Sequence, residues 1–92
     1  MGNVEKHFTY ILKSVADGSY YIGHTKALKA RLTKHNNARS GYTARKKPWQ
    51  IVYAEEFNNK ADAMRREKFL KEQKNRDFYN RLIDNGPVVQ LG

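Results

Sequence analysis

The sequence contains no cysteine. A disulfide framework, a zinc site built on cysteine thiolates and a thiol nucleophile are therefore all excluded. The absence of cysteine is also compatible with a reducing compartment, and we expect a cytoplasmic protein.

Long apolar stretches are missing as well. No run approaches the roughly 18 residues that a membrane span requires, and residues 1–7 are polar, unlike a signal peptide. We therefore expect no membrane partner. A chain of 92 residues has room for one small domain, which buries roughly 60–65% of the surface of its unfolded chain. We expect a single domain over residues 1–92, with its core at about 7–83 and a loose tail at 86–92.

Acidic residues are few, because 9 Asp and Glu stand against 18 Lys and Arg, giving a formal net charge of +9. Such an excess favours a polyanionic partner. Nucleic acid is the first choice, and an anionic membrane surface is the second. The alternative is a basic surface without a binding role.

Residues 7–13 and 19–24 alternate in the manner of two strands and are rich in aromatic side chains, and Gly18 lies in the turn between them. These features predict an antiparallel hairpin. If the connection has an even number of residues, Tyr10 and Tyr21 lie on the same face of the sheet. An odd loop or a bulge would separate them.

The next segment, residues 26–37, has the pattern of a helix for which Thr25 is the expected N-cap. The stripe that should meet the sheet consists of two apolar and two polar residues: Leu28, Arg31, Leu32 and His35. Partly buried charge must be paired or functional. This stripe is therefore the first indication of a site.

The remaining chain predicts a loop, a strand and two helices. The loop, residues 36–48, carries a cationic cluster with one aromatic residue in it, and a third strand follows at 49–57. We expect one face of that strand to carry Trp49, Ile51 and Tyr53.

Asn59 is the expected cap of the next helix, with Asp62 in its first turn. Glu67 lies in the middle of the apolar arc of that helix, which is marked by Ala63, Met64 and Leu70.

A last helix, at about 76–84, is expected to pack through Phe78, Leu82 and Ile83.

Five polar residues on inward faces could together hydrolyse a phosphodiester: Tyr10, Tyr21, Arg31, His35 and Glu67. The carboxylate could bind one divalent metal ion, and the guanidinium could hold non-bridging oxygens. A phenol or imidazole could orient or deprotonate water. Only one carboxylate is well placed, which argues for a single Mg²⁺ or Mn²⁺ ion that keeps several waters.

Each of these residues also has a structural interpretation. The tyrosines could be core aromatics with a hydroxyl at the rim, and Arg31 could pair with Glu67 across two helices. His35 could complement the dipole at the end of its helix. The order of the residues along the chain, more than any one of them, favours a site.

The motifs resemble those of the GIY-YIG nuclease superfamily, in particular small single-domain bacterial proteins similar to the N-terminal domain of the excinuclease C subunit. The second motif is intact as Tyr21-Ile22-Gly23, and Phe8-Thr9-Tyr10 stands where Gly-Ile-Tyr would be. Residues 28–36 match the arginine helix of the family, and residues 63–68 resemble its glutamate helix. The resemblance covers about residues 7–83.

The resemblance implies an α/β (α+β) fold, a three-stranded sheet flanked by helices, and a metal-dependent endonuclease site. In that site Tyr10 or Tyr21 would activate water, Arg31 would stabilise the transition state, and Glu67 would bind the metal. His35 would be an accessory group.

The expected substrate is DNA more than RNA, with little sequence specificity. A phosphate track would be formed by Lys29, Arg39, Tyr42, Arg45, Lys46 and Lys47. The alternatives are a non-catalytic nucleic-acid-binding module and an accessory subunit of a DNA repair complex.

Overall fold

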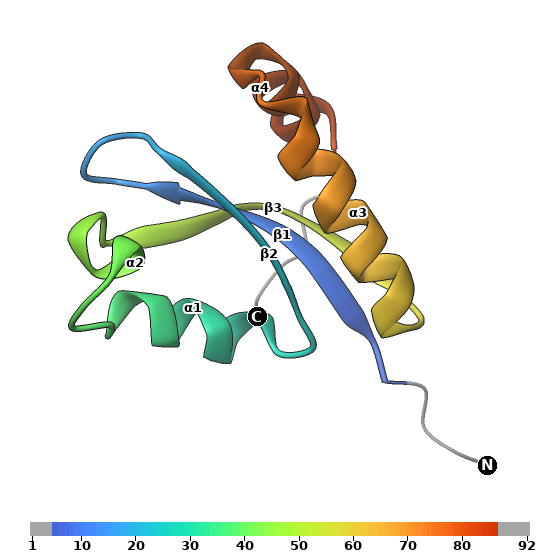
Figure 1. Cartoon of the computed structure of the whole chain (residues 1–92), viewed down its shortest axis with the longest axis horizontal. Helices are drawn as coiled ribbons and strands as arrows, with labels where there is room; N and C mark the ends of the chain where they lie inside the picture. Colours follow the sequence, from blue (N-terminus) through green and yellow to red (C-terminus); the bar gives the residue numbers. More distant parts are fainter. Residues whose placement is uncertain (1–4, 87–92) are drawn as a thin grey trace.

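A computed structural model describes residues 5–86, so all of the expected tail at 86–92 except Gly86 lies outside the described residues. The elements, in chain order, are β1 (His7–Ser14), β2 (Tyr20–Thr25), α1 (Leu28–Asn36), α2 (Tyr42–Arg45), β3 (Trp49–Phe57), α3 (Lys60–Gln73) and α4 (Arg76–Asn85). The three strands form one sheet, with α1 and α2 on one side and α3 and α4 on the other (Figure 1). The expected three-stranded α+β fold is thereby confirmed. None of the helices within residues 5–86 combines the length and the hydropathy that crossing a bilayer demands.

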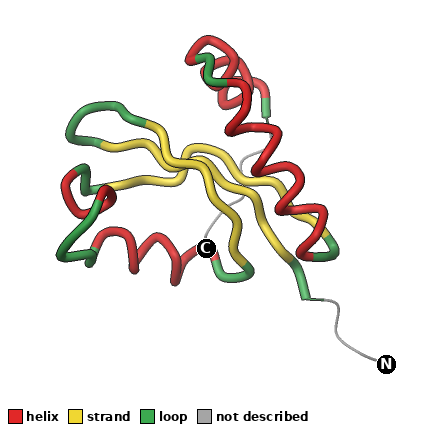
Figure 2. Tube along the Cα trace, viewed as in Figure 1, coloured by secondary structure: helices red, strands yellow, loops and turns green. Residues whose placement is uncertain are grey.

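The strand order is β2-β1-β3, and β1 is antiparallel to both of its neighbours, so β2 and β3 are the edges of the sheet (Figure 2). In the hairpin Tyr10 lies opposite Gly23, and Leu12 lies opposite Tyr21. Side chains alternate along each strand. Tyr10 and Tyr21 therefore share a face, as the even-loop alternative predicts.

The expectation for β3 is wrong in one respect. Trp49 and Ile51 pack in the cluster on the α1 side, but Tyr53 packs in the cluster on the α3 side. The register with β1 shifts between Ile11 and Leu12, which pair with Tyr53 and Ile51. The extra residue, Val52, is a bulge that exchanges the faces of everything after it.

Each face of the sheet therefore has its own hydrophobic cluster. The cluster on the α1 side comprises Tyr10, Leu12, Leu28, Trp49 and Ala54, with Tyr21 and Leu32 packed against it. The cluster on the α3 side comprises Ile11, Ile22, Tyr53, Leu70 and Tyr79, with Phe78, Leu82 and Ile83 packed against it. A polar side chain at the edge of one cluster is therefore on the opposite side of the sheet from a polar side chain at the edge of the other.

The helix ends show which capping signals were effective. The side chain of Asn59 accepts from the backbone N–H of Asp62, as expected for an N-cap. Thr25 does not cap α1, because that helix begins only at Leu28 and its N-cap is Ala27. The Thr25 hydroxyl instead accepts from the N–H of Ala27 and closes a short turn before the helix.

Candidate active site

Three of the five predicted catalytic side chains meet on the α1 side of the sheet. The Tyr10 hydroxyl lies 3.2 Å from Nε2 of His35, and both residues are buried, with 2% and 8% of their surface exposed. The ring of Tyr21 stacks against Tyr10 at 6.5 Å and meets the edge of His35 at 4.8 Å, both between ring centroids. Tyr21 itself is half-buried.

The glycine of the Tyr-Ile-Gly motif makes this arrangement fit. A Cβ on Gly23 would lie 2.6 Å from the Tyr10 hydroxyl and 2.8 Å from Cζ of the same ring. Real Cβ contacts are essentially never that short, so the Tyr10 ring lies directly over the β2 backbone. Gly23 is therefore required for close packing of a neighbouring ring.

Burial determines the protonation of the Tyr10–His35 pair. Desolvation raises the pKa of the Tyr10 phenol well above its ordinary value, Tyr21 raises it further, and Arg31 partly opposes this. Desolvation also lowers the pKa of His35, with help from the positive charges of Arg31 and Lys34. Both groups are thus neutral near pH 7, and the imidazole is able to accept a proton.

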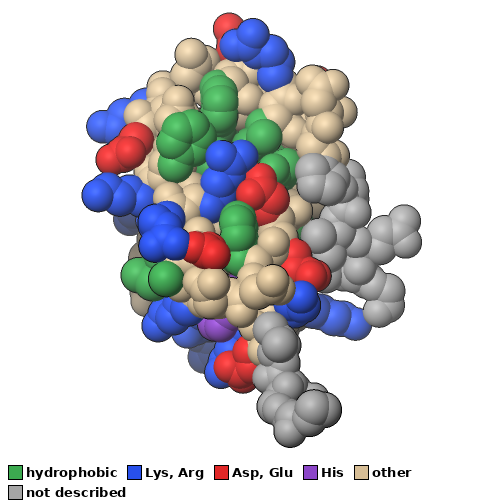
Figure 3. Space-filling model, turned by 90° about the vertical axis from the view of Figure 1, so that its right-hand side faces the viewer, with side chains coloured by type: hydrophobic (Ala, Val, Ile, Leu, Met, Phe, Trp, Pro, Cys, Tyr) green, Lys and Arg blue, Asp and Glu red, His purple; other side chains and the backbone are tan. Residues whose placement is uncertain are grey.

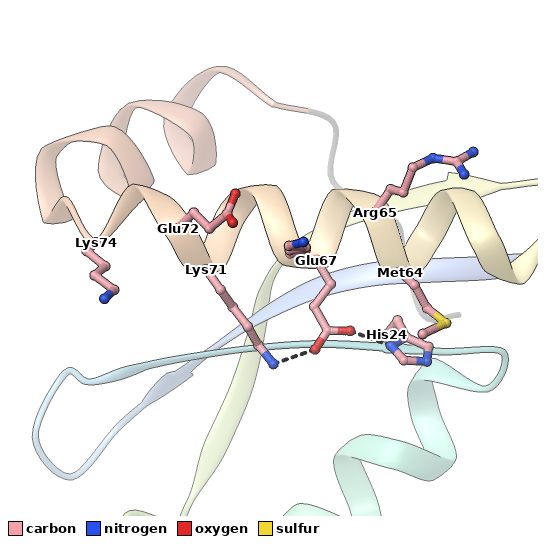
Figure 4. Close-up of a pocket in the computed structure, with 8 residues that line it drawn as sticks. His24, Met64, Arg65, Glu67, Lys71, Glu72 and Lys74 are labelled. Atoms are coloured by element: carbon pink, nitrogen blue, oxygen red, sulfur yellow. Dashed lines mark hydrogen bonds and ion pairs between the residues drawn. The ribbon is translucent and has the colours of Figure 1, made fainter.

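Glu67 extends from α3 on the other side of the sheet, toward the edge strand β2 (Figure 4). One carboxylate oxygen contacts Nδ1 of His24, and the other lies 2.5 Å from Nζ of Lys71. The Glu67 side chain is only 15% exposed. Burial raises the pKa of Glu67, but the hydrogen bonds from Lys71 and His24 outweigh burial and hold the pKa below its ordinary value. The carboxylate is therefore ionised and fixed.

Sequence reasoning missed His24. The signal was its register, because His24 lies opposite Thr9, whose hydroxyl donates to the Ala63 carbonyl of α3. Side chains opposite each other share a face. His24 thus faces α3, one position after the glycine of the motif, and meets Glu67 there.

Arg31 does not pair with Glu67, contrary to the structural interpretation of these two residues. The ion pairs of Glu67 within residues 5–86 are with His24 and Lys71. Arg31 is half-buried and lines a cavity of about 430 Å³. His24 also lines this cavity, and it lines the larger cavity beside Glu67 as well. The imidazole of His24 therefore contacts the carboxylate of Glu67 and lines the same cavity as the guanidinium of Arg31.

The residues of the predicted phosphate track do not line the cavity beside Glu67 or the cavity of Arg31. Lys46 pairs with Asp17 of the hairpin turn at 2.5 Å, and Lys47 donates to the Ala38 carbonyl at 2.9 Å. Tyr42 packs against Tyr21, at 6.5 Å between ring centroids. The other members of the predicted track, Lys29, Arg39 and Arg45, are exposed.

The donor atoms at Glu67 suit one kind of metal site. Among residues 5–86 no three His, Asp or Glu side chains converge as metal ligands. One ionised carboxylate oriented by His24 fits a single hard divalent cation that keeps most of its waters. A closed protein cage, such as a structural zinc site, does not fit these residues.

Comparison with known proteins identifies the relatives of the chain. The UPF0213 protein SSP2268 of Staphylococcus saprophyticus is 42% identical over 69 residues, which cover 74% of this chain and 83% of the relative. The UPF0213 protein SA0446 of Staphylococcus aureus is 39% identical over the same length and shares.

Two solved structures are similar. The solution NMR structure of the UPF0213 protein BH0048 from Bacillus halodurans has a TM-score of 0.54 and 32% identity, covering 86% of this chain and 83% of that one. The NMR structure of EF2693 from E. faecalis has a TM-score of 0.56 and 27% identity over the full length of both chains. The family model of the GIY-YIG catalytic domain matches residues 6–81. The expected family is confirmed, and this chain belongs to the GIY-YIG catalytic domain family.

Proposed function

We propose that this protein is a metal-dependent endonuclease that hydrolyses phosphodiester bonds in nucleic acid, in DNA more than in RNA, with little sequence specificity. The observation that carries the proposal is the position of His24. It touches Glu67 and lines the cavity of Arg31, so that an ionised carboxylate and a guanidinium border adjoining cavities. Membership in the GIY-YIG catalytic domain family also supports the proposal of nuclease activity.

Glu67 is the residue that would hold a single Mg²⁺ or Mn²⁺ ion, and the ion would polarise the phosphate and the leaving oxygen. His24 keeps the carboxylate in one orientation. For binding, the carboxylate has to exchange its Lys71 partner for the cation, and Lys71 is then free to contact the substrate.

Arg31 is the transition-state stabiliser in this proposal. Its planar guanidinium can hold two non-bridging oxygens of the phosphate at once. Arg31 makes no ion pair with a described carboxylate within residues 5–86, so its donors remain available to a substrate in the cavity that it lines.

In this proposal the proton of the attacking water is transferred by the group formed by Tyr10, Tyr21 and His35. Tyr10 is almost fully buried, whereas Tyr21 is half-buried, so we assign contact with the attacking water to Tyr21. His35 touches both rings and is neutral because burial lowers its pKa. It is the group able to take up a proton as the water attacks.

The alternative is a non-catalytic nucleic-acid-binding module or an accessory subunit of a DNA repair complex. One observation favours it. Lys71 occupies one of the two oxygens of Glu67, as it would in a purely structural ion pair.

The deciding experiment compares cleavage of supercoiled plasmid and of flapped oligonucleotides, with Mg²⁺ or Mn²⁺, by the wild type, Glu67→Gln and Glu72→Gln. Glu72 is the matched control, because it lines the same cavity and loses the same charge. We expect Glu67→Gln to abolish cleavage and to leave binding nearly intact, while Glu72→Gln still cuts. Equal cleavage by all three proteins would remove Glu67 from the site. Salt-sensitive binding without cleavage by any of them would establish the binding module.

A further inference from the structure

Two cavities share His24 as a lining residue. The first, about 430 Å³, is lined by Lys26, Arg31 and Lys60 together with the imidazoles of His7 and His24. The second, about 600 Å³, lies along α3 and is lined by Met64, Glu67, Lys68, Lys71 and Lys74 together with His24. Because His24 belongs to both, a ligand longer than either cavity can occupy the two in succession.

Positive charge dominates both cavities. The first has three Lys and Arg residues against one acidic residue, Glu5. The second, which Arg65 and Glu72 also line, has four Lys and Arg residues against two Glu. The molecular face shown in Figure 3 carries Lys and Arg side chains together with Asp, Glu and hydrophobic ones. A ligand that spans both cavities therefore has to be an anion with charges spaced along its length.

Three lysines lie in series at the C-terminal end of α3. Lys68 and Lys71 are on the helix, separated by roughly 4.5 Å of helix rise, and Lys74 is the C-cap residue that follows it. One strand of a duplex carries a phosphate about every 3.4 Å of its axis. In Figure 4 Lys71 and Lys74 point to the same side of α3 as Glu67.

Two of these lysines have their ammonium groups available. No side-chain hydrogen bond or ion pair of Lys68 or Lys74 occurs within residues 5–86, whereas Lys71 is bonded to Glu67. Met64, which lines the same cavity, is 46% exposed and adds an apolar surface that a sugar ring can cover. Lysine ammonium groups and one thioether suit contacts with the sugar–phosphate backbone. Such a surface contributes little to the recognition of base edges, and therefore little sequence specificity.

We propose that the nucleic-acid backbone runs along α3 and across His24, with Lys68, Lys71 and Lys74 on one side of Glu67 and Lys26, Arg31 and Lys60 on the other. This inference rests on the proposed function, because it places the substrate of that site. In this arrangement the main contact of the protein with the nucleic acid is α3, and not the loop at residues 36–48. In the loop, Lys46 and Lys47 are already bonded within the protein.

The test measures the salt dependence of the dissociation constant for a fluorescent DNA duplex, in EDTA so that no cleavage occurs. The wild type is compared with Lys68→Gln/Lys74→Gln and with the loop variant Arg39→Gln/Arg45→Gln. Both double variants remove two exposed positive charges, so a general electrostatic effect lowers binding equally in both. Each phosphate contact adds about 0.9 to the slope of log affinity against log salt concentration. We expect the magnitude of this slope to be about 1.8 smaller in Lys68→Gln/Lys74→Gln than in the wild type. The loop variant should keep the wild-type slope.

Equal losses in the two variants, or a larger loss in the loop variant, would overturn the α3 path. The measurement does not depend on catalysis. A wild type that binds with the expected slopes and never cuts DNA would overturn the endonuclease and leave the path standing. A wild-type slope near zero would overturn the path even if cleavage were observed.

Discussion

The Nδ1 atom of His24 on β2 contacts a carboxylate oxygen of Glu67 on α3, although the two residues are 43 positions apart in the sequence. This contact is the point at which the edge strand of the sheet meets the helix that carries the candidate metal ligand. It fixes the carboxylate on one side, while Lys71 approaches its other oxygen. Four predictions follow from this geometry and from that of the residues around it.

His24→Ala should weaken metal binding. Groups that orient a metal ligand typically contribute 10- to 100-fold in affinity, so we expect about that loss in Mn²⁺ affinity, measured by electron paramagnetic resonance. His7→Ala is the control, because His7 lines a cavity with His24 but forms no ion pair with Glu67 within residues 5–86. Unchanged Mn²⁺ affinity in His24→Ala would leave His24 with a structural role only.

Arg31→Ala should slow cleavage by about 10²- to 10³-fold, the usual effect of removing one electrostatic stabiliser of a transition state. The free energy of unfolding should change by less than about 1 kcal/mol, since Arg31 has no ion pair with Glu67 to lose. Arg31→Lys, which keeps the charge without the planar fork, should recover part of the rate. A rate loss that only parallels unfolding in urea would argue for a structural role of Arg31.

His35 should make stability depend on pH. Burial, aided by Arg31 and Lys34, lowers the pKa of His35 in the folded state below the roughly 6.5 of the unfolded chain. The unfolded state then binds more protons in the interval between the two values, so stability rises with pH there. The contribution of neutral His35 is complete above about pH 6.5 and is lost as the pH falls through the folded pKa. The stability gap between wild type and His35→Gln, measured by urea unfolding, should therefore shrink from pH 8 to pH 5. A gap that stays constant would contradict this assignment.

Gly23→Ala should destabilise the fold by about 1–3 kcal/mol, the usual cost of overpacking. The new Cβ would lie 2.6 Å from the Tyr10 hydroxyl, so the ring has to move and its contact with His35 is strained. Urea unfolding gives the value. In a Tyr10→Leu background the ring is absent, and the same glycine substitution should then cost much less. Equal costs in both backgrounds would show that the backbone of β2, and not the tyrosine, demands glycine.

Local patterns were sufficient for most of the fold. Alternation along β1 and β2 placed Tyr10 and Tyr21 on one face for an even loop, and the observed register, which opposes Leu12 to Tyr21, selects that alternative. The Asn59 cap was also predictable, since its acceptor and the N–H of Asp62 are three residues apart. These features depend on neighbours along the chain or across one hairpin.

The features that were missed depend on distant partners. The bulge at Val52 arises from pairing with β1, and the pattern of β3 alone reads as uninterrupted alternation. His24 acquires its role from Glu67, on a helix that begins 36 residues later. Thr25 has the chemistry of a helix cap, yet the chain turns once more before α1, and the hydroxyl closes that turn.

The position of β2 at the edge of the sheet has a consequence for thermal unfolding of the protein. Among the described residues, 5–86, β1 is the strand to which β2 is hydrogen-bonded, whereas β1 has a neighbour on both sides. Tyr21, Gly23 and His24 all lie on β2, so both halves of the candidate site depend on this one ladder. Edge elements open locally at lower free energy than central ones. Amide protons of β2 should therefore exchange faster than those of β1, and the site should come apart below the temperature at which the fold melts.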